Sequence, residues 1–363
     1  MTLTETAQLT KRGAAVLIIA LTAGFTGRAA WSRIKPIIFP PQTPPPEVAF
    51  GKLLRLEIPG LPLAETSKPE YVVDTTTGRL PQDLPDRAKV YRIILPETTL
   101  LTSQRAKDLA AKLGFSQSPQ KISSSEYRFE NSEEGRILQM NITTGNFDLE
   151  TDVKKLTDLA SGSPPSKAAA VEQAATFLQN LGLLNDDYTK GRKDGSYLKI
   201  EGGILKKVDN LSSAHLTRVD FFRKIEEQPI VGAKPYGGLI TVILGKDSVP
   251  FVSYHFWPLN PSQSTTYPLK TVEQMWSETQ EGKAQIVFLA PANADPFASY
   301  EPSAPEKLFV TKIYLGYFDS EKFQEYLQPV YILEGLGLTA DRVQLKLIAY
   351  VPAVADDWVK KEK

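Results

Sequence analysis

The stretch that most constrains the fold is residues 217–259, TRVDFFRKIEEQPIVGAKPYGGLITVILGKDSVPFVSYHFWPL, which is typical of three short strands separated by turns. The runs 239–244 and 249–257 are rich in β-branched and aromatic residues, which favour strands, and they flank the turn sequence Gly-Lys-Asp-Ser. Both faces of the second run are mostly apolar. The two runs are therefore predicted to form a hairpin in the middle of a sheet, with a helix packed against one face.

Three segments have the pattern of an amphipathic helix: a capping residue, apolar residues spaced three and four apart, and a terminal glycine. They are residues 102–113, 166–181 and 271–281. Thr102 or Ser103, Ser166 and Thr271 are the predicted caps, and each segment is followed by a stretch with strand periodicity. A unit of one helix and a few strands is thus predicted to occur three times.

The predicted fold class is α+β, built from repeated modules in which one helix packs on an antiparallel sheet. The modules are expected at 48–160, 161–266 and 267–354, and a charged tail follows at 355–363. Segments rich in Ser, Pro and Gly at 161–166 and 260–268 are the predicted linkers between them.

The third helix and the final strand are predicted to share a core. Met275 and Trp276 fall on the inner face of the helix and Glu278 on its outer face, while Val343, Leu345 and Leu347 fall on one face of the strand. An isolated helix of this length is marginal because nucleation is costly, so its stability is expected to come from burial against the sheet.

An uncharged apolar run, GAAVLIIALTAGFTG, occupies residues 13–27. It is shorter than the roughly 20 residues that cross a bilayer, but snorkelling of Arg28 and an interfacial Trp31 extend it to residue 31. We predict an uncleaved single-pass membrane anchor at 13–31. A cleaved signal peptide is the alternative, because Gly27 and Ala29 suit a cleavage site.

The orientation of this anchor does not follow from charge, since basic residues lie on both sides of it. Short N-terminal tails usually stay inside, so residues 1–12 are expected in the cytoplasm and the C-terminal body outside it. Residues 32–47 form a predicted Pro-rich linker, with six prolines between 36 and 46. Such a sequence favours extended polyproline II and acts as a stiff spacer; a ligand segment for SH3-type domains is the alternative.

The chain has no cysteine, which excludes disulfides, thiol nucleophiles, iron–sulfur clusters and cysteine-ligated zinc. Its 42 basic residues balance its 42 acidic residues, and no basic stripe occurs. The electrostatic footprint of a nucleic-acid-binding protein is therefore missing from the sequence.

Two parts of the sequence resemble known bacterial families. The segment RVDFFRKIEEQPIVG…GLITVILGKDSVPFVSYHFWPL resembles the PepSY-like module, in which strands with a polar-Pro-Val-x-Gly turn pack on one helix. The pattern FVTKIYLGYF, YLQPVYILEG and LIAYVPAV is similar to the ending of YycH/YycI-type regulators. The resemblance implies a single-pass membrane protein whose extracytoplasmic body modulates a partner protein.

No catalytic, cofactor-binding or metal-ligating residue is predicted. The two histidines, His215 and His255, lie 40 positions apart and fit no metal-binding motif, and His255 is expected to be a half-buried, hydrogen-bonded strand residue. Gly245-Lys246 is a turn and not a phosphate-binding loop, and no nucleophile elbow occurs. The pairs 186–187 and 356–357, both Asp-Asp, are expected to be solvated turn and tail charges.

The predicted function is that of a membrane-anchored, extracytoplasmic interaction or regulatory protein and not an enzyme. Its expected partners are the membrane, through residues 13–31, and another envelope protein, with no nucleic acid and no cofactor. Two alternatives are an envelope hydrolase that uses carboxylates scattered in the sequence, and a purely structural stalk-and-head protein. The first alternative would require titratable groups gathered in a cleft.

Overall fold

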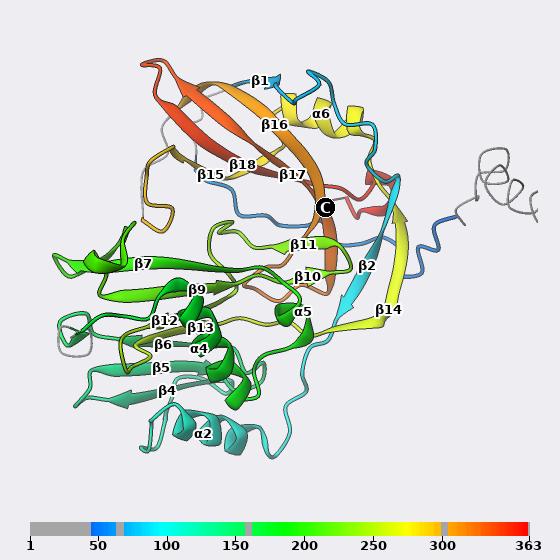
Figure 1. The fold of residues 1–363 in the computed structure, drawn as a ribbon. Coiled ribbons are helices and arrows are strands. Elements are labelled where there is room, and N and C mark those ends of the chain that lie inside the picture. Colours follow the sequence, from blue (N-terminus) through cyan, green and yellow to red (C-terminus); the bar gives the residue numbers. More distant parts are fainter. Residues whose placement is uncertain (1–44, 63–68, 157–161, 299–303, 362–363) are drawn as a thin grey trace, which may run out of the picture. The chain divides into compact units, whose positions relative to one another are not determined.

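Two large sheets dominate the computed structural model, which describes residues 45–62, 69–156, 162–298 and 304–361 (Figure 1). Both sheets belong to one unit, Glu47–Lys363. The predicted anchor and most of the predicted Pro-rich linker lie outside the described residues, so they stay predictions. Among the helices that the structure describes, none is long and apolar enough to cross a membrane.

The first of the two, the antiparallel sheet, has nine strands, and all its neighbours run in opposite directions. In order across the sheet they are β3 (Gln120–Lys121), β4 (Glu126–Asn131), β5 (Arg136–Asn141), β6 (Phe147–Thr151), β13 (Phe251–Tyr254), β12 (Ile240–Leu244), β9 (Leu216–Phe221), β7 (Lys193–Glu201) and β8 (Ile204–Val208). The predicted hairpin is confirmed, since β12 pairs with β13 near the middle of this sheet.

The second, the mixed sheet, also has nine strands. Its main path is β10 (Lys224–Ile225), β11 (Gln228–Val231), β16 (Pro305–Phe318), β17 (Tyr326–Thr339), β18 (Gln344–Pro352) and β15 (Gln285–Pro291). Off this path, β1 (Glu70–Val73) pairs with β16, and β2 (Arg87–Ile93) pairs with β17 and with β14 (Leu259–Pro268). The pairs β1–β16 and β11–β16 are parallel.

The predicted α+β fold of repeated modules is wrong, because the chain is mostly β and its strands pair across the expected module boundaries. β6, expected in the first module, pairs with β13 of the second. β1 and β2, expected in the first module, join the mixed sheet near the C-terminus. The physical reason is that hydrophobic alternation fixes which face of a strand is buried, but it does not specify which strand satisfies the backbone groups at its edge. The predicted linker 260–268 is likewise wrong, since β14 occupies it.

The three predicted helices are present as α2 (Thr102–Lys112), α4 (Lys167–Asn180) and α6 (Val272–Gln280), and a short α5 (Asp186–Thr189) follows α4 (Figure 1). Two 3₁₀ turns span Leu211–Ser213 and Asp356–Trp358. Ser166 caps α4, and Thr271 forms a capping box with Gln274 at α6. The predicted cap of the first helix is wrong: Thr102 is already helical, and no side chain caps α2.

The helices α2 and α4 pack on the same core of the antiparallel sheet. Ala106 and Ala110 of α2 and Ala170, Ala174 and Leu178 of α4 are buried in one cluster with the inward side chains of the strands. Small residues on the helix faces allow both helices to approach the sheet closely. Burial on this scale supplies the stability that such short helices lack alone.

The α6 helix packs on one face of the mixed sheet, as predicted, but its orientation differs in detail. Met275 is fully buried, whereas Trp276 is only partly buried. Glu278 does not face outward: it accepts two hydrogen bonds from the largely buried Lys270 at 2.7 and 2.9 Å. Val343 is exposed and precedes β18, because a turn with Thr339 holds it outside the strand.

Candidate functional site

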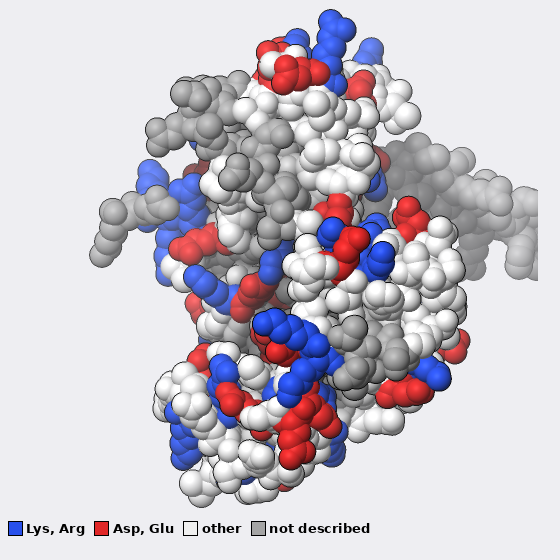
Figure 2. Space-filling model, turned by 90° about the vertical axis from the view of Figure 1, so that its left-hand side faces the viewer, with Lys and Arg blue, Asp and Glu red and all other residues white. Residues whose placement is uncertain are grey.

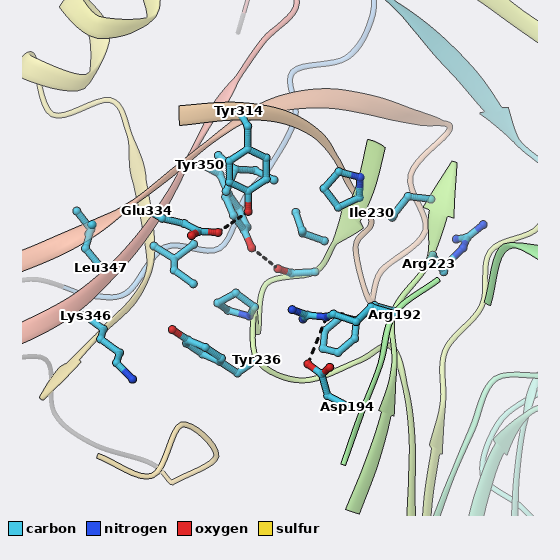
Figure 3. Close-up of a pocket in the computed structure, with 18 of the residues that line it drawn as sticks. Arg192, Asp194, Arg223, Ile230, Tyr236, Tyr314, Glu334, Lys346, Leu347 and Tyr350 are labelled. Carbon is cyan, nitrogen blue, oxygen red and sulfur yellow. Dashed lines mark hydrogen bonds and ion pairs between the residues drawn. The ribbon is translucent and has the colours of Figure 1, made fainter. Parts of the chain in front are cut away.

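A groove of about 720 Å³ opens on the face of the mixed sheet opposite α6. Its floor is made by side chains of β16, β17 and β18, and its other wall by β11, the loop after it and the start of β7. Figure 3 shows Tyr314, Glu334 and Tyr350 on the floor, with Tyr236 and Arg192 across the groove from them.

Tyrosines give the groove its main chemical character. The Tyr314 hydroxyl donates to a Glu334 carboxylate oxygen at 2.5 Å, and burial together with this carboxylate raises the Tyr314 pKa above its ordinary value. The Tyr350 hydroxyl donates to the Gly232 carbonyl at 3.2 Å, which ties the loop after β11 to the floor. The Tyr236 ring packs edge-on against Phe288, with 4.6 Å between ring centroids. The aromatic surface is therefore held in place by hydrogen bonds and packing.

Charges in the groove are mostly neutralised within it. Arg192 pairs with Asp194 at 3.2 Å, and Lys224 pairs with Glu227 at 2.7 Å. Lys346 is exposed on the groove floor and has no ion-pair partner among the described residues. Across a neighbouring face of the molecule, positive and negative side chains are interspersed and form no single-sign field (Figure 2).

An unpaired stretch of strand borders this groove. The outer edge of β16 pairs with β1 along Lys307–Val310 and with β11 at Tyr317 and Phe318. Between these two ladders, residues 311–315 have no strand partner on that side among the described residues, and Gly316 lies against Pro229 of β11. Thr311 and Tyr314 of this stretch line the groove. Backbone donors and acceptors at such an edge can pair with another extended chain.

A buried ionic cluster lies at one end of the groove, centred on Arg223. Its guanidinium binds Asp319 and also donates to Asp187 at 2.7 and 3.1 Å. The Phe256 ring lies 4.9 Å from the guanidinium carbon. Burial raises the pKa of Asp319 and Arg223 opposes that rise in part. Because Asp319 follows β16 and Arg223 follows β9, the cluster connects the two sheets.

The antiparallel sheet brings a serine, a histidine and an aspartate together, but not in a catalytic arrangement. Ser253 donates to Asp148 Oδ1 at 2.7 Å, and His255 Nε2 lies 3.3 Å from the same oxygen. A nucleophilic triad needs the serine hydroxyl bonded to the imidazole, with the carboxylate on the other ring nitrogen. Here the carboxylate oxygen is shared by both, which is the arrangement of a hydrogen-bonded strand pair. The expectation that His255 is half-buried and hydrogen-bonded is confirmed.

The remaining residues that the sequence singled out lie apart from the groove. His215 Nδ1 accepts the Ile200 amide at 3.1 Å, so it supports the β7–β9 region structurally. The expectation of solvated charge holds for Asp186, but it is wrong for Asp187, which binds Arg223. Asp356, in the C-terminal segment, is mostly exposed and pairs with Lys270 at 3.0 Å.

The sequence did not indicate the groove residues. Tyrosines and charged residues at alternating strand positions give the same sequence pattern whether they are solvated or face a cavity. The only signal was the strand periodicity of residues 307–315, in which buried and more open positions alternate on either side of Thr311. In the described part of the chain, no group of three or more His, Asp or Glu side chains is placed to hold a metal ion.

Comparisons with known proteins add no family. No protein-family model matches the chain, and no curated protein does either. Among solved structures, the chain is similar to an uncharacterized protein from Eubacterium rectale, at 12% identity over 73% of this chain and 82% of the other, with a TM-score of 0.41. The resemblance to PepSY-like and YycH/YycI-type proteins is thus not supported by these comparisons.

Proposed function

We propose that this chain is an interaction and regulatory protein of the cell envelope, held at the membrane by residues 13–31, whose body binds a segment of another protein in the groove. The observation that supports this most directly is a preformed, tyrosine-lined groove beside an unpaired strand edge. Rigid tyrosines supply large contact area at low conformational cost, and for this reason they are enriched at binding surfaces.

The chemistry of the groove favours binding over hydrolysis. Each acidic residue lining it already has a partner: Asp194 and Glu227 are in ion pairs, and Glu334 accepts from a tyrosine. A hydrolase would need carboxylates directed at a substrate, with pKa values shifted for proton transfer. The carboxylates of this groove are used to hold its walls.

Site-specific photocrosslinking in intact cells of the source organism tests this proposal. The full-length chain would carry p-benzoylphenylalanine in place of Tyr236, on the groove wall, or in place of Ile204, an exposed residue of β8 on the antiparallel sheet. Irradiation is expected to give one discrete protein adduct from position 236 and none from position 204. Charge reversal by Lys346→Glu is expected to reduce the adduct.

The opposite results would contradict the proposal. Identical adducts from positions 236 and 204 would mean that the groove has no special affinity. An absence of adducts at position 236, with the chain folded and present at normal levels, would rule out a groove-bound protein partner in those cells.

A further inference from the structure

The β16 strand contains the same four-residue pattern twice. Lys307-Leu308-Phe309-Val310 and Lys312-Ile313-Tyr314-Leu315 each read as lysine, aliphatic, aromatic, aliphatic, with Thr311 between them. The burial pattern repeats as well: exposed lysine, buried aliphatic, partly buried aromatic, buried aliphatic. Both aliphatic pairs face the core under α6. The register shift against β17 at Thr311 adds one residue to β16, so the aliphatic residues of both copies face the same side of the sheet.

The first copy is already bound by a strand of this chain. β1, with the sequence Glu-Tyr-Val-Val, adds in parallel so that Glu70 faces Lys307 and Tyr71 faces Leu308. The Glu70 carboxylate lies 2.9 Å from the Lys307 ammonium, and the Tyr71 side chain is buried in the core under α6. The strand that pairs with the first copy thus carries an acidic residue opposite the lysine, followed by an apolar residue directed into the core.

The second copy has the same chemistry and no occupant among the described residues. Lys312 is exposed, and its ammonium lies 4.4 Å from the centre of the Tyr314 ring. Glu334 is opposite Lys312 in the register with β17, but its carboxylate accepts from Tyr314 and no ion pair with Lys312 forms. The Lys312 charge is therefore available to an acid on an added strand.

We propose that an extended segment of the partner protein, with an acidic residue followed by alternating apolar residues, adds in parallel to Lys312–Leu315. This inference rests on the proposed function, since it names the partner chemistry at the border of the same groove. Its acid pairs with Lys312, its backbone pairs with the open edge at Ile313 and Leu315, whose side chains are already buried, and its alternate side chains enter the groove beside Tyr314. The added strand fills the space between β1 and β11 and makes the outer edge of β16 continuous.

A labelled peptide tests the inference. The probe is a fluorescent, end-capped ten-residue peptide with Glu-Tyr-Val-Val at its centre, titrated into the purified full-length chain and followed by anisotropy. Because an exposed ion pair and its reversal differ by on the order of 1–2 kcal/mol, Lys312→Glu should weaken binding roughly tenfold. A Lys-Tyr-Val-Val peptide should bind the Lys312→Glu variant better than the wild type. Since Glu334 lies opposite, Lys312→Gln provides a neutral variant that creates no new repulsion.

Hydrogen exchange locates the peptide on the chain. Slower exchange of the backbone amides at 312–315 is the expected result. Faster exchange of the β1 amides without protection at 312–315 would mean that the peptide displaces β1, which overturns the inference. Self-association of the chain that Lys312→Gln dissolves would identify a second copy as the occupant and overturn it too. If the peptide fails to bind while the crosslink from position 236 persists, this inference falls and the proposed function stands; loss of both removes both.

Discussion

Substitution of Arg223 is expected to destabilise the protein strongly, because this residue is the central charge of a cluster that joins the two sheets. Its side chain is 1% exposed, as against 0% for Asp319 and 26% for Asp187. One carboxylate oxygen of Asp319 is buried with no hydrogen-bond partner, so this aspartate depends on Arg223 for nearly all the compensation of its charge. Substitution of Arg223 by methionine keeps much of the volume and removes the charge.

The expected cost of Arg223→Met at neutral pH is about 3–5 kcal/mol, which is typical when one partner of a buried ion pair is removed. That is a large fraction of the roughly 5–15 kcal/mol by which a domain is stable. Most of the cost comes from the unpaired Asp319, because Asp187 is partly solvated. The double variant Arg223→Met/Asp319→Asn should therefore recover stability relative to Arg223→Met, and a double-mutant cycle measures that coupling.

The pH dependence gives a second, independent readout. Burial already raises the folded-state pKa of Asp319, and loss of Arg223 removes the effect that opposes this rise. Between the unfolded and the raised folded pKa, the folded state binds one more proton, so stability of Arg223→Met should increase by about 1.4 kcal/mol per pH unit as pH falls. Urea unfolding followed by circular dichroism between pH 4 and 8 would measure it.

Arg218→Met serves as the matched control. Arg218 pairs with the buried Asp220 at 2.7 Å, but Asp220 also accepts from the Thr241 hydroxyl at 2.7 Å and the Gly238 amide at 3.0 Å. Loss of Arg218 thus leaves a carboxylate with two partners, and the cost should be clearly smaller than for Arg223→Met. Equal unfolding midpoints for wild type and Arg223→Met, or a destabilisation that does not change with pH, would refute the reasoning.

Three further outcomes follow from single contacts. The hydrogen bond to Asp148 raises the pKa of His255. The stability that this interaction contributes is therefore full below about pH 6.5 and is lost as pH rises through the folded pKa. His255→Gln should flatten the dependence of melting temperature on pH across that window, and an unchanged slope would contradict this. Met275→Ala should cost about 2–5 kcal/mol in urea unfolding, and more than Trp276→Ala, because only Met275 is fully buried. Gly191→Ala should lower the melting temperature strongly, since its Cβ would lie 1.7 Å from a backbone oxygen, and a normal melt would show that the wall of the groove can shift.

The helices and turns were predictable from the sequence because local chemistry determines them. Thr271 with Gln274 forms a capping box, and Gly114, Gly182 and Gly282 have the positive φ angles that end a helix at glycine. The hairpin of residues 239–257 was predictable for the same reason, since its two strands are adjacent in the chain. Each of these elements depends on residues less than about twenty positions apart.

The sheets were not predictable, because their pairings connect distant parts of the chain. β1 and β16 are more than two hundred residues apart, and nothing local to Glu70–Val73 indicates Lys307–Val310 as its neighbour. The same applies to the Arg223 cluster, which gathers residues from α5, from the segment after β9 and from the segment after β16. Asp187 looked like a turn charge since its buried partner lies 36 positions away.

The unpaired residues 311–315 of β16 have features that oppose pairing with other chains and features that fit the proposed added strand, and the two are compatible. A lysine on an edge strand and a bulge beside it oppose indiscriminate pairing with other chains, because an added strand must neutralise the charge and follow the irregular register. Lys312 and Thr311 occupy those positions. A strand without an acid opposite Lys312 gains only backbone hydrogen bonds there, whereas one with an acid at that position, as Glu70 is opposite Lys307, gains an ion pair as well. On this proposal Lys312 both opposes indiscriminate pairing and selects the added strand, so Lys312→Ala should widen the range of peptides that bind while it weakens binding of the acidic peptide. Equal selectivity in wild type and Lys312→Ala would show that the lysine protects the edge without choosing its partner.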